Sequence, residues 1–406
     1  MKESATTIPG LLRRIKPGNL LSFGPDTPAL EMQNLNVLIG PNGVGKSNLI
    51  EALALMRATP RTVSNADVRG VIRRGGGASE WIWKGAADQP ASVELTINGP
   101  AQEPLRHRFS FRDNRGRFQL EEERVENEAR FGTYGGKDLP HSYYKFEGAY
   151  STISVIEEGR ETARKLDREL VNPELSILAQ RRDPERYPEI TYLAEMYESW
   201  SIYREWSFGR NTIFREPQKA DMRNDRLEED FSNLGLVLNQ LSIVPKAKAA
   251  ILTGLRDLYE GISDFQVSIQ GGAVQVFLLE GDFSMPATRL SDGTLRYLCL
   301  LAILCDPEPP RLVCLEEPEL GLHPDVLPKL ADRLVAASDR TQLIVTTHSD
   351  ILVDALTEHP ETVVVCEKHD GRTEMRRQKK EELAAWLEDY RLGQLWMKGQ
   401  LGGTRW

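Results

Sequence analysis

The sequence predicts an α/β fold, and three observations carry that prediction. Apolar runs typical of buried strands end abruptly at Gly40, at Glu316 and just before His348. The first run is followed by a glycine-rich loop and then by good helix formers, which is the order of a strand–loop–helix unit. In open α/β sheets ligands bind at the carboxyl ends of the strands. We therefore expect these three strand ends to meet at one site.

The glycine-rich segment is a phosphate loop. It fits the pattern G-x-x-x-x-G-K-[ST] without a mismatch and consists of Gly40, Pro41, Asn42, Gly43, Val44, Gly45, Lys46 and Ser47. Its glycines allow successive N–H groups to turn toward an anion, and the following helix adds free N–H groups. We expect Lys46 to reach the β- and γ-phosphates of ATP and Ser47 to bind Mg²⁺, with Asn48 beside them. The alternative, a glycine-rich turn, leaves the flanking strand and helix unexplained.

Two adjacent carboxylates, Glu316 and Glu317, close the second apolar run. Their mutual repulsion calls for a compensating cation. We expect Glu316 to bind Mg²⁺, directly or through water, and Glu317 to orient and deprotonate the attacking water. The alternative is a solvated acidic turn.

His348, after the third run, is predicted to contact the γ-phosphate, with Ser349 as a lesser candidate, although a lone histidine is more often structural.

Ser291 is a good N-cap for the apolar helix that starts near Leu295. A helix N-terminus that begins with Ser291, Asp292 and Gly293 forms a second anion site. Taken alone, these residues also fit an ordinary capped helix.

In this order, the motifs resemble those of the ABC-type ATPase heads of the SMC, RecF and OLD group, which have an AAA-type ATPase core. The resemblance covers about residues 8–56 and 286–355. It implies that the turn Ser291–Gly293 grips the γ-phosphate of ATP held by an opposite subunit. A homodimer, or a higher oligomer, would then close around ATP. Glu316 departs from the aspartate that many such heads carry.

The resemblance also implies a role in bacterial DNA maintenance or phage defence. ATPases of this type often act with a separately encoded effector, either a nuclease or a toxin, and DNA is a candidate ligand. The alternatives are the nucleotide-binding subunit of a membrane transporter and a scaffold that holds ATP without hydrolysing it. The intact Glu317 argues against the scaffold.

The expected layout has four parts. These are an N-terminal part of the head with antiparallel strands (1–150), a helical lid insertion (151–263), a C-terminal part of the head (264–360), and a hairpin with one helix from Glu381 to Trp396 (361–406). Prolines within the insertion exclude a long coiled coil. The segment after His348 is too short for a TOPRIM nuclease domain, so we expect none.

Two features of the insertion have competing interpretations. Gln180 is a candidate for a glutamine that senses the metal, although an exposed helix glutamine is more common. An aromatic stripe near Arg204 and Arg210 could stack nucleic-acid bases. At helical spacing it more often forms the buried face of an amphipathic helix. The stripe comprises Leu193, Met196, Tyr197, Trp200, Tyr203 and Trp206.

The composition limits the function classes. With 51 Lys and Arg against 60 Asp and Glu, the net charge is −9, so bulk charge does not indicate nucleic-acid binding. The four cysteines form no CxxC pair and are expected as reduced core residues. No apolar run is long enough to span a membrane and no signal-peptide pattern is present, so we expect a cytoplasmic protein.

Overall fold

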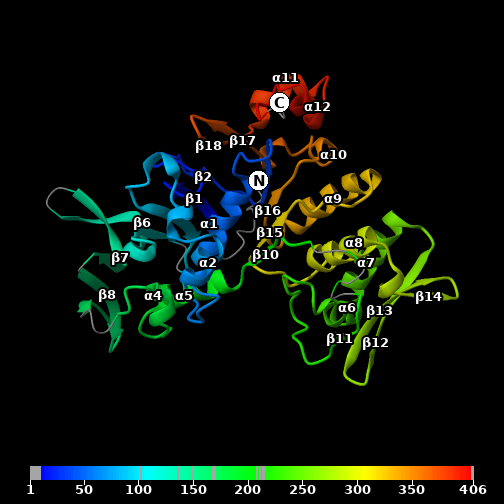
Figure 1. Cartoon of the computed structure of the whole chain (residues 1–406), viewed down its shortest axis with the longest axis horizontal. Coiled ribbons are helices and arrows are strands. Elements are labelled where there is room, and N and C mark those ends of the chain that lie inside the picture. The colour runs from blue at the N-terminus through cyan, green and yellow to red at the C-terminus, as the bar shows by residue number, and fades with distance from the viewer. Residues whose placement is uncertain are drawn as a thin grey trace, which may run out of the picture.

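The structure is a computed structural model that describes residues 11–100, 103–134, 137–148, 150–166, 171–206, 209, 212 and 215–403. Three β-sheets and the helices packed on them make up this part of the chain. In Figure 1 the central sheet lies between a large antiparallel sheet on the left and a smaller sheet on the lower right.

The central sheet has the strand order β10-β15-β16-β3-β17-β18. All neighbours are parallel except β17 and β18. Thr346 pairs with both Glu316 and Leu38, so the ends of β15, β16 and β3 coincide as predicted. The strands are β3 (Leu35–Ile39), β10 (Ser201–Tyr203), β15 (Leu312–Glu316), β16 (Gln342–Thr346), β17 (Val363–His369) and β18 (Arg372–Arg377).

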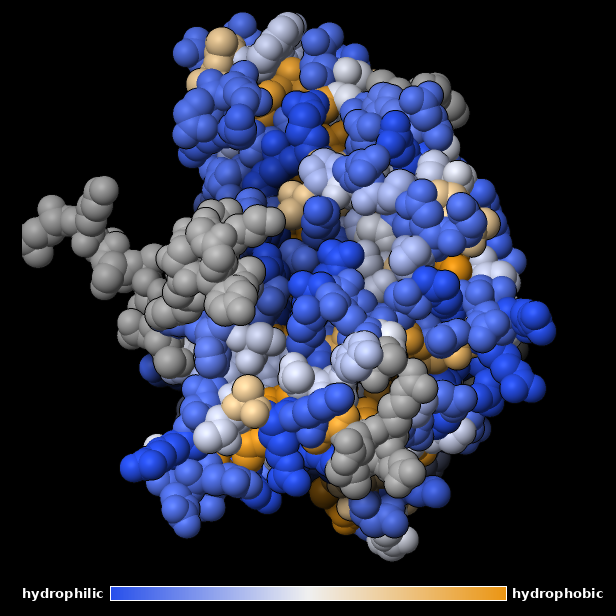
Figure 2. Space-filling view, turned by 90° about the vertical axis from the view of Figure 1, so that its left-hand side faces the viewer, coloured by the Kyte–Doolittle hydropathy of each residue, from blue (hydrophilic) through white to orange (hydrophobic). Residues whose placement is uncertain are grey.

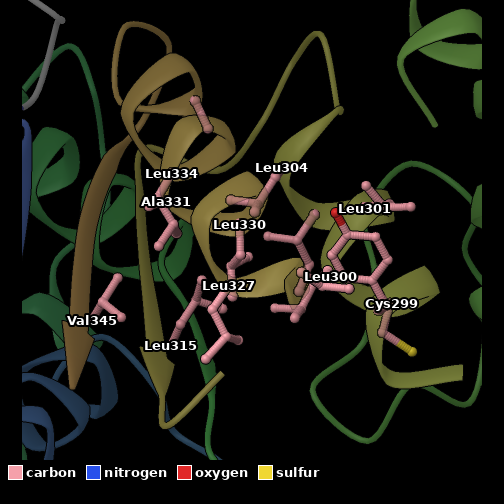
Figure 3. Close-up of a cluster of buried hydrophobic side chains, with 14 of the residues drawn as sticks. Cys299, Leu300, Leu301, Leu304, Leu315, Leu327, Leu330, Ala331, Leu334 and Val345 are labelled. Atoms are coloured by element: carbon pink, nitrogen blue, oxygen red, sulfur yellow. The ribbon is translucent and has the colours of Figure 1, made fainter. Parts of the chain in front are cut away.

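Both faces of the central sheet are covered. Val37, Leu315 and Val345 face one buried cluster, whereas Leu38 and Cys314 face the other, as the alternation of side chains along a strand requires. Figure 3 shows the first cluster, in which leucines of α8 and α9 pack against β15 and β16. The covering helices are α1 (Lys46–Ala58) and α5 (Pro188–Glu198) on one side and α8 (Asp292–Leu304) and α9 (Leu327–Ala337) on the other.

The antiparallel sheet has the order β2-β1-β4-β5-β6-β7-β8-β9. The antiparallel strands expected in residues 1–150 include a hairpin, in which Asn114 pairs with Arg117 across a turn where Arg115 and Gly116 have positive φ. The strands are β1 (Leu12–Gly18), β2 (Leu30–Glu31), β4 (Ala91–Asn98), β5 (Pro104–Asn114), β6 (Arg117–Tyr134), β7 (Lys137–Glu147), β8 (Tyr150–Glu157) and β9 (Arg160–Leu166). The short helices α2 (Val68–Arg74), α3 (Ala78–Trp81) and α4 (Ile177–Gln180) accompany them.

The expected helical lid insertion, residues 151–263, needs a correction in its first part. Residues 150–166 form the edge hairpin β8–β9 of the antiparallel sheet, and β10 joins the central sheet. The side chains of β9 are exposed on both faces as far as Lys165, which removes the period-two signal of a half-buried strand. The predicted boundaries at 150 and 263 fall at the start of β8 and inside β12.

The third sheet pairs β11, β13 and β12 in that order, with β14 on the other edge of β13. Helices α6 and α7 pack on it and against α8. This part of the chain therefore supports the helix that starts at Ser291. The elements are β11 (Gln218–Lys219), α6 (Leu234–Ile243), α7 (Pro245–Leu258), β12 (Ile262–Gln270), β13 (Ala273–Glu280) and β14 (Phe283–Pro286).

The C-terminal hairpin is confirmed and extends the central sheet, since β17 pairs with β3. The single helix predicted for Glu381–Trp396 is wrong. Two helices, α11 (Lys380–Leu387) and α12 (Leu392–Met397), replace it, and the chain breaks the helix at residues 388–391. Helix α12 packs against α10 (Asp350–Asp354), where a Cβ on Gly393 would come within 2.3 Å of the Asp350 carbonyl oxygen.

The remaining composition-based predictions concern the core and the surface. Cys299, Cys314 and Cys366 are buried and free, as predicted, and burial raises the pKa of Cys366 to about 12. Within the described residues, no helix is both long and apolar enough to cross a bilayer. The face in Figure 2 is mostly hydrophilic and carries separate small apolar patches.

Candidate active site

The phosphate loop lies between β3 and α1 and has the backbone shape that anion binding needs. Gly40, Gly43 and Gly45 have φ values of 144°, 76° and 102°, a region that disfavours other residues. No side chain caps the first turn of α1. The Asn48 N–H donates to the Gly45 carbonyl oxygen at 3.1 Å, which leaves the N–H groups of Lys46 and Ser47 for a ligand. Lys46 lies inside the loop, where its Nζ donates to the carbonyl oxygens of Gly40 at 2.8 Å and Pro41 at 3.0 Å.

Side chains from distant segments support the loop from behind. Thr373 Oγ1 lies 2.5 Å from the Val44 carbonyl oxygen and 2.6 Å from Ser22 Oγ. Asn48 was predicted to lie at the nucleotide, but its amide donates to Ser22 Oγ at 2.8 Å. A Cβ on Gly45 would lie 2.3 Å from both hydroxyl oxygens. Hence the structure uses Asn48 to hold the loop.

The acidic pair lies beside the phosphate loop. The Ser47 hydroxyl donates to the Glu316 carboxylate, so the two predicted magnesium ligands are in direct contact. Trp206 Nε1 donates to the Glu316 carbonyl oxygen at 2.7 Å. Arg204 lies close to the pair: its Nε is 4.0 Å from Glu316 Oε2, and its Nη1 donates to Glu51 at 2.5 Å.

Glu317 is held in an unusual backbone conformation. Its φ is 46°, which is uncommon for a residue other than glycine, and its N–H donates to the Thr346 carbonyl oxygen at 3.0 Å. His348 Nε2 lies 3.3 Å from Glu317 Oε1. Arg296 of α8 donates to the Glu317 carbonyl oxygen at 2.9 Å and lies over the Trp206 ring at 4.5 Å. The acidic pair is thus fixed from two sides.

The Lys46 ammonium group of the loop and the carboxylates after β15 belong to one charged site. Burial lowers the pKa of Lys46 below its usual value, and the nearby carboxylates of Glu317, Glu319 and Glu316 oppose this shift. The Ser47–Glu316 hydrogen bond places a carboxylate of β15 beside the loop that holds Lys46. The spatial convergence of the phosphate loop and the twin glutamates, expected from the sequence, is present.

These residues fit ATP with Mg²⁺. Among the described residues, no group of three or more His, Cys, Asp or Glu side chains could hold a metal ion by itself. The hydrogen bond between Ser47 and Glu316 nonetheless brings a hydroxyl oxygen and a carboxylate oxygen together beside the loop. Mg²⁺ is ordinarily bound by one or two protein oxygens, with water and substrate phosphates completing its shell. A loop that cradles phosphates beside this oxygen pair matches that requirement.

The N-terminus of α8 is built differently. As predicted, Ser291 caps it, since its Oγ accepts from Thr294 N at 3.0 Å. Asp292 forms an ion pair with Arg215, which also donates to the Leu290 carbonyl oxygen at 2.7 Å. Within the described part of the chain, no hydrogen bond or ion pair joins Ser291, Asp292 or Gly293 to the phosphate loop of the same chain.

The family and the fold neighbours agree with this geometry. The family model described as "AAA domain, putative AbiEii toxin, Type IV TA system" matches residues 35–354, more than half of the chain. The chain belongs to this family. The phosphate loop, the acidic pair and the fold agree with the P-loop ATPase head expected from the sequence.

Solved structures show the same fold for this AAA-domain protein. One is the SmcHead bound to the C-winged helix domain of ScpA, with a TM-score of 0.57 and 12% identity over 91% of this chain and 99% of that one. Another is the Pyrococcus furiosus Smc head domain with an extended coiled coil bound to the C-terminal domain of ScpA, with a TM-score of 0.56, 12% identity, and coverage of 94% and 99%. No curated protein matches the chain.

Two features of the insertion had both a functional and a structural interpretation. The Gln180 amide is bonded within its own segment: its Oε1 accepts from Asn172 N at 2.7 Å, and its Nε2 donates to the Leu175 carbonyl oxygen at 2.8 Å. Gln180 as a metal contact stays a prediction. The aromatic stripe is buried from Leu193 to Tyr203, which supports the core interpretation over base stacking. Arg210 lies outside the described residues.

Sequence reasoning missed the residues that arrange the acidic pair. Trp206 was assigned to the aromatic stripe, and Arg296 was read only as part of an apolar helix. No local pattern connects either of them to Glu317, since Arg296 lies 21 positions away. Glu319 is the exception, because it lies only two positions after Glu317 in the sequence.

Proposed function

We propose that this AAA-domain protein hydrolyses ATP and uses hydrolysis to switch a larger complex. The observation that carries the proposal is the meeting of Ser47 with Glu316, and of His348 with Glu317, at one edge of the central sheet. A chain that merely held ATP would need the phosphate loop but not a carboxylate placed beside a histidine.

Each residue has a chemical role in this proposal. Bound Mg²⁺ would supply a Lewis acid for the phosphate oxygens, held by Ser47 and Glu316. Lys46 would exchange its two carbonyl acceptors for phosphate oxygens, which bind a cation more strongly. Glu317 would accept the proton of the attacking water. His348 would hold the Glu317 carboxylate in place and donate to the γ-phosphate.

The proposal extends to assembly. The turn Ser291–Gly293 contacts Thr294 and Arg215 of its own chain, and we place the ATP that it serves on a second copy. Hydrolysis would then separate two heads. The Smc heads that share this fold are bound to ScpA domains, which supports a separately encoded partner here. An effector of nuclease or toxin type, with DNA as a further ligand, is the partner we propose.

The substitution Glu317→Gln tests hydrolysis, because it keeps the shape and removes the proton acceptor. We expect turnover to fall by roughly a hundredfold or more while ATP stays bound. Hydrolysis and equilibrium ATP binding are measured on the same preparation, with the exposed Glu358→Gln as the matched control. Turnover equal to wild type would assign the base elsewhere, and a wild-type protein without turnover would favour the scaffold.

Native mass measurement of the complex from its host, with and without ATP, tests the assembly. We expect ATP to increase the number of heads per particle and a second polypeptide to accompany them. A single chain under both conditions, without partner or nucleic acid, would contradict the switch.

A further inference from the structure

Glu319 lies two positions after Glu317 and has one buried carboxylate oxygen, Oε2. Its side chain points toward the end of β16, where Oε1 accepts from Thr347 Oγ1 at 2.5 Å and from the His348 backbone N–H at 2.8 Å. One oxygen atom thus ties the loop after β15 to the segment after β16. These are the two segments that carry Glu317 and His348.

We propose that Glu319 is a positioning residue that sets the His348 imidazole against the Glu317 carboxylate. This inference rests on the proposed hydrolytic function. The backbone N–H of His348 is bound by Glu319, while its ring Nε2 lies 3.3 Å from Glu317 Oε1. Fixing the main chain of the histidine therefore fixes where its ring can lie. Misplacement by about 1 Å at a reacting centre is costly, so this restraint affects turnover.

Glu319 positions His348 through the acceptor atom Oε1. Its second oxygen, Oε2, is buried and has no hydrogen-bond partner in the described part of the chain. An ionised carboxylate with one unsolvated oxygen is unfavourable, and burial correspondingly raises the pKa of Glu319. Glutamine keeps the accepting oxygen in the same place, whereas alanine removes it.

Three variants test this assignment. Glu319→Ala is expected to lower kcat about tenfold, the cost of one lost restraint, with the KM for ATP within about twofold of wild type. The kcat of Glu319→Gln is expected to lie close to that of wild type. Thr347→Val removes only the Thr347 hydroxyl donor, and we expect its kcat to lie between those of the two Glu319 variants. The exposed Glu358→Ala is the control for the loss of an acidic side chain.

A double-mutant cycle with His348→Ala separates positioning from a general structural effect. If Glu319 acts through the histidine, adding Glu319→Ala to His348→Ala lowers kcat no further. Additive losses, or a Gln variant as poor as the Ala variant, would overturn the inference. The inference would also be overturned if the melting temperatures of Glu319→Ala and Glu319→Gln fell in proportion to their losses of kcat. A wild-type protein without turnover would instead refute the proposed function, while the hydrogen bonds of Glu319 would stand.

Discussion

The N-termini of α1 and α8 are both expected to face phosphate, yet their local structures differ. At α1, Gly45 provides no side-chain cap and Lys46 brings a positive charge. At α8, Ser291 already accepts the Thr294 N–H, and Asp292 brings a negative charge that Arg215 balances. The first end is open to an anion. The second is closed by its own side chains.

This difference shows that a helix N-terminus alone does not define a phosphate site. The side chains of the first turn decide whether the N–H groups and the dipole are available. We therefore expect α1 to dominate ATP affinity. The end of α8 would contribute only when a second head brings a phosphate close enough to share the Ser291 hydroxyl and its neighbouring N–H groups.

The largest expected effect concerns the N-terminus of α1, which is the open end. Lys46→Ala removes the charge that the loop holds and should weaken ATP binding by about a hundredfold, because hydrogen bonds to charged groups contribute about 1.5–3 kcal/mol. Titration of a fluorescent ATP analogue at fixed magnesium measures this. The exposed Lys329→Ala serves as the control. Unchanged affinity in the Lys46 variant would contradict the role of α1.

A second test asks whether the shape of the open end depends on glycine. In Gly45→Ala the new Cβ would collide with Ser22 Oγ and Thr373 Oγ1, each 2.3 Å away, at a φ of 102°. We expect the free energy of unfolding to fall by about 1–3 kcal/mol. Gly271→Ala is the matched control, since its φ is also positive and nothing lies within 4 Å of the added Cβ. Urea unfolding of both variants gives the comparison, and equal losses would show that packing behind the loop is unimportant.

The smallest expected effect concerns the N-terminus of α8, which is the closed end. Ser291→Ala should lower the free energy of unfolding by about 1 kcal/mol, because the cap is lost. Ser291→Asp should keep the cap but repel a phosphate from a second head. We expect Ser291→Ala to have a lower melting temperature than Ser291→Asp in thermal unfolding. In light scattering, ATP-dependent association should be lost in Ser291→Asp. Full association of the Asp variant would exclude this turn from the dimer contact.

Much of the fold could be predicted from the sequence because its signals are local. The strand at Leu35–Ile39, the glycine loop and the start of α1 follow directly from apolar runs, glycines and helix formers. Gly116 and Gly371 are also local signals, because each glycine allows the positive φ that a tight hairpin turn requires. The edge strand β9 was missed because an exposed strand loses the alternation by which strands are recognised.

The sequence alone determined that a phosphate loop, an acidic pair and a histidine each end a buried strand, because residue types and their spacing record these features. Only the tertiary structure decided what surrounds them. Arg296 binds the Glu317 carbonyl oxygen, Glu319 binds the His348 N–H, and Gln180 is bonded within its own segment. The contacts of Arg296 and Glu319 join residues 21 and 29 positions apart. No local pattern encodes them, because they form only when folding brings the ends of the parallel strands together.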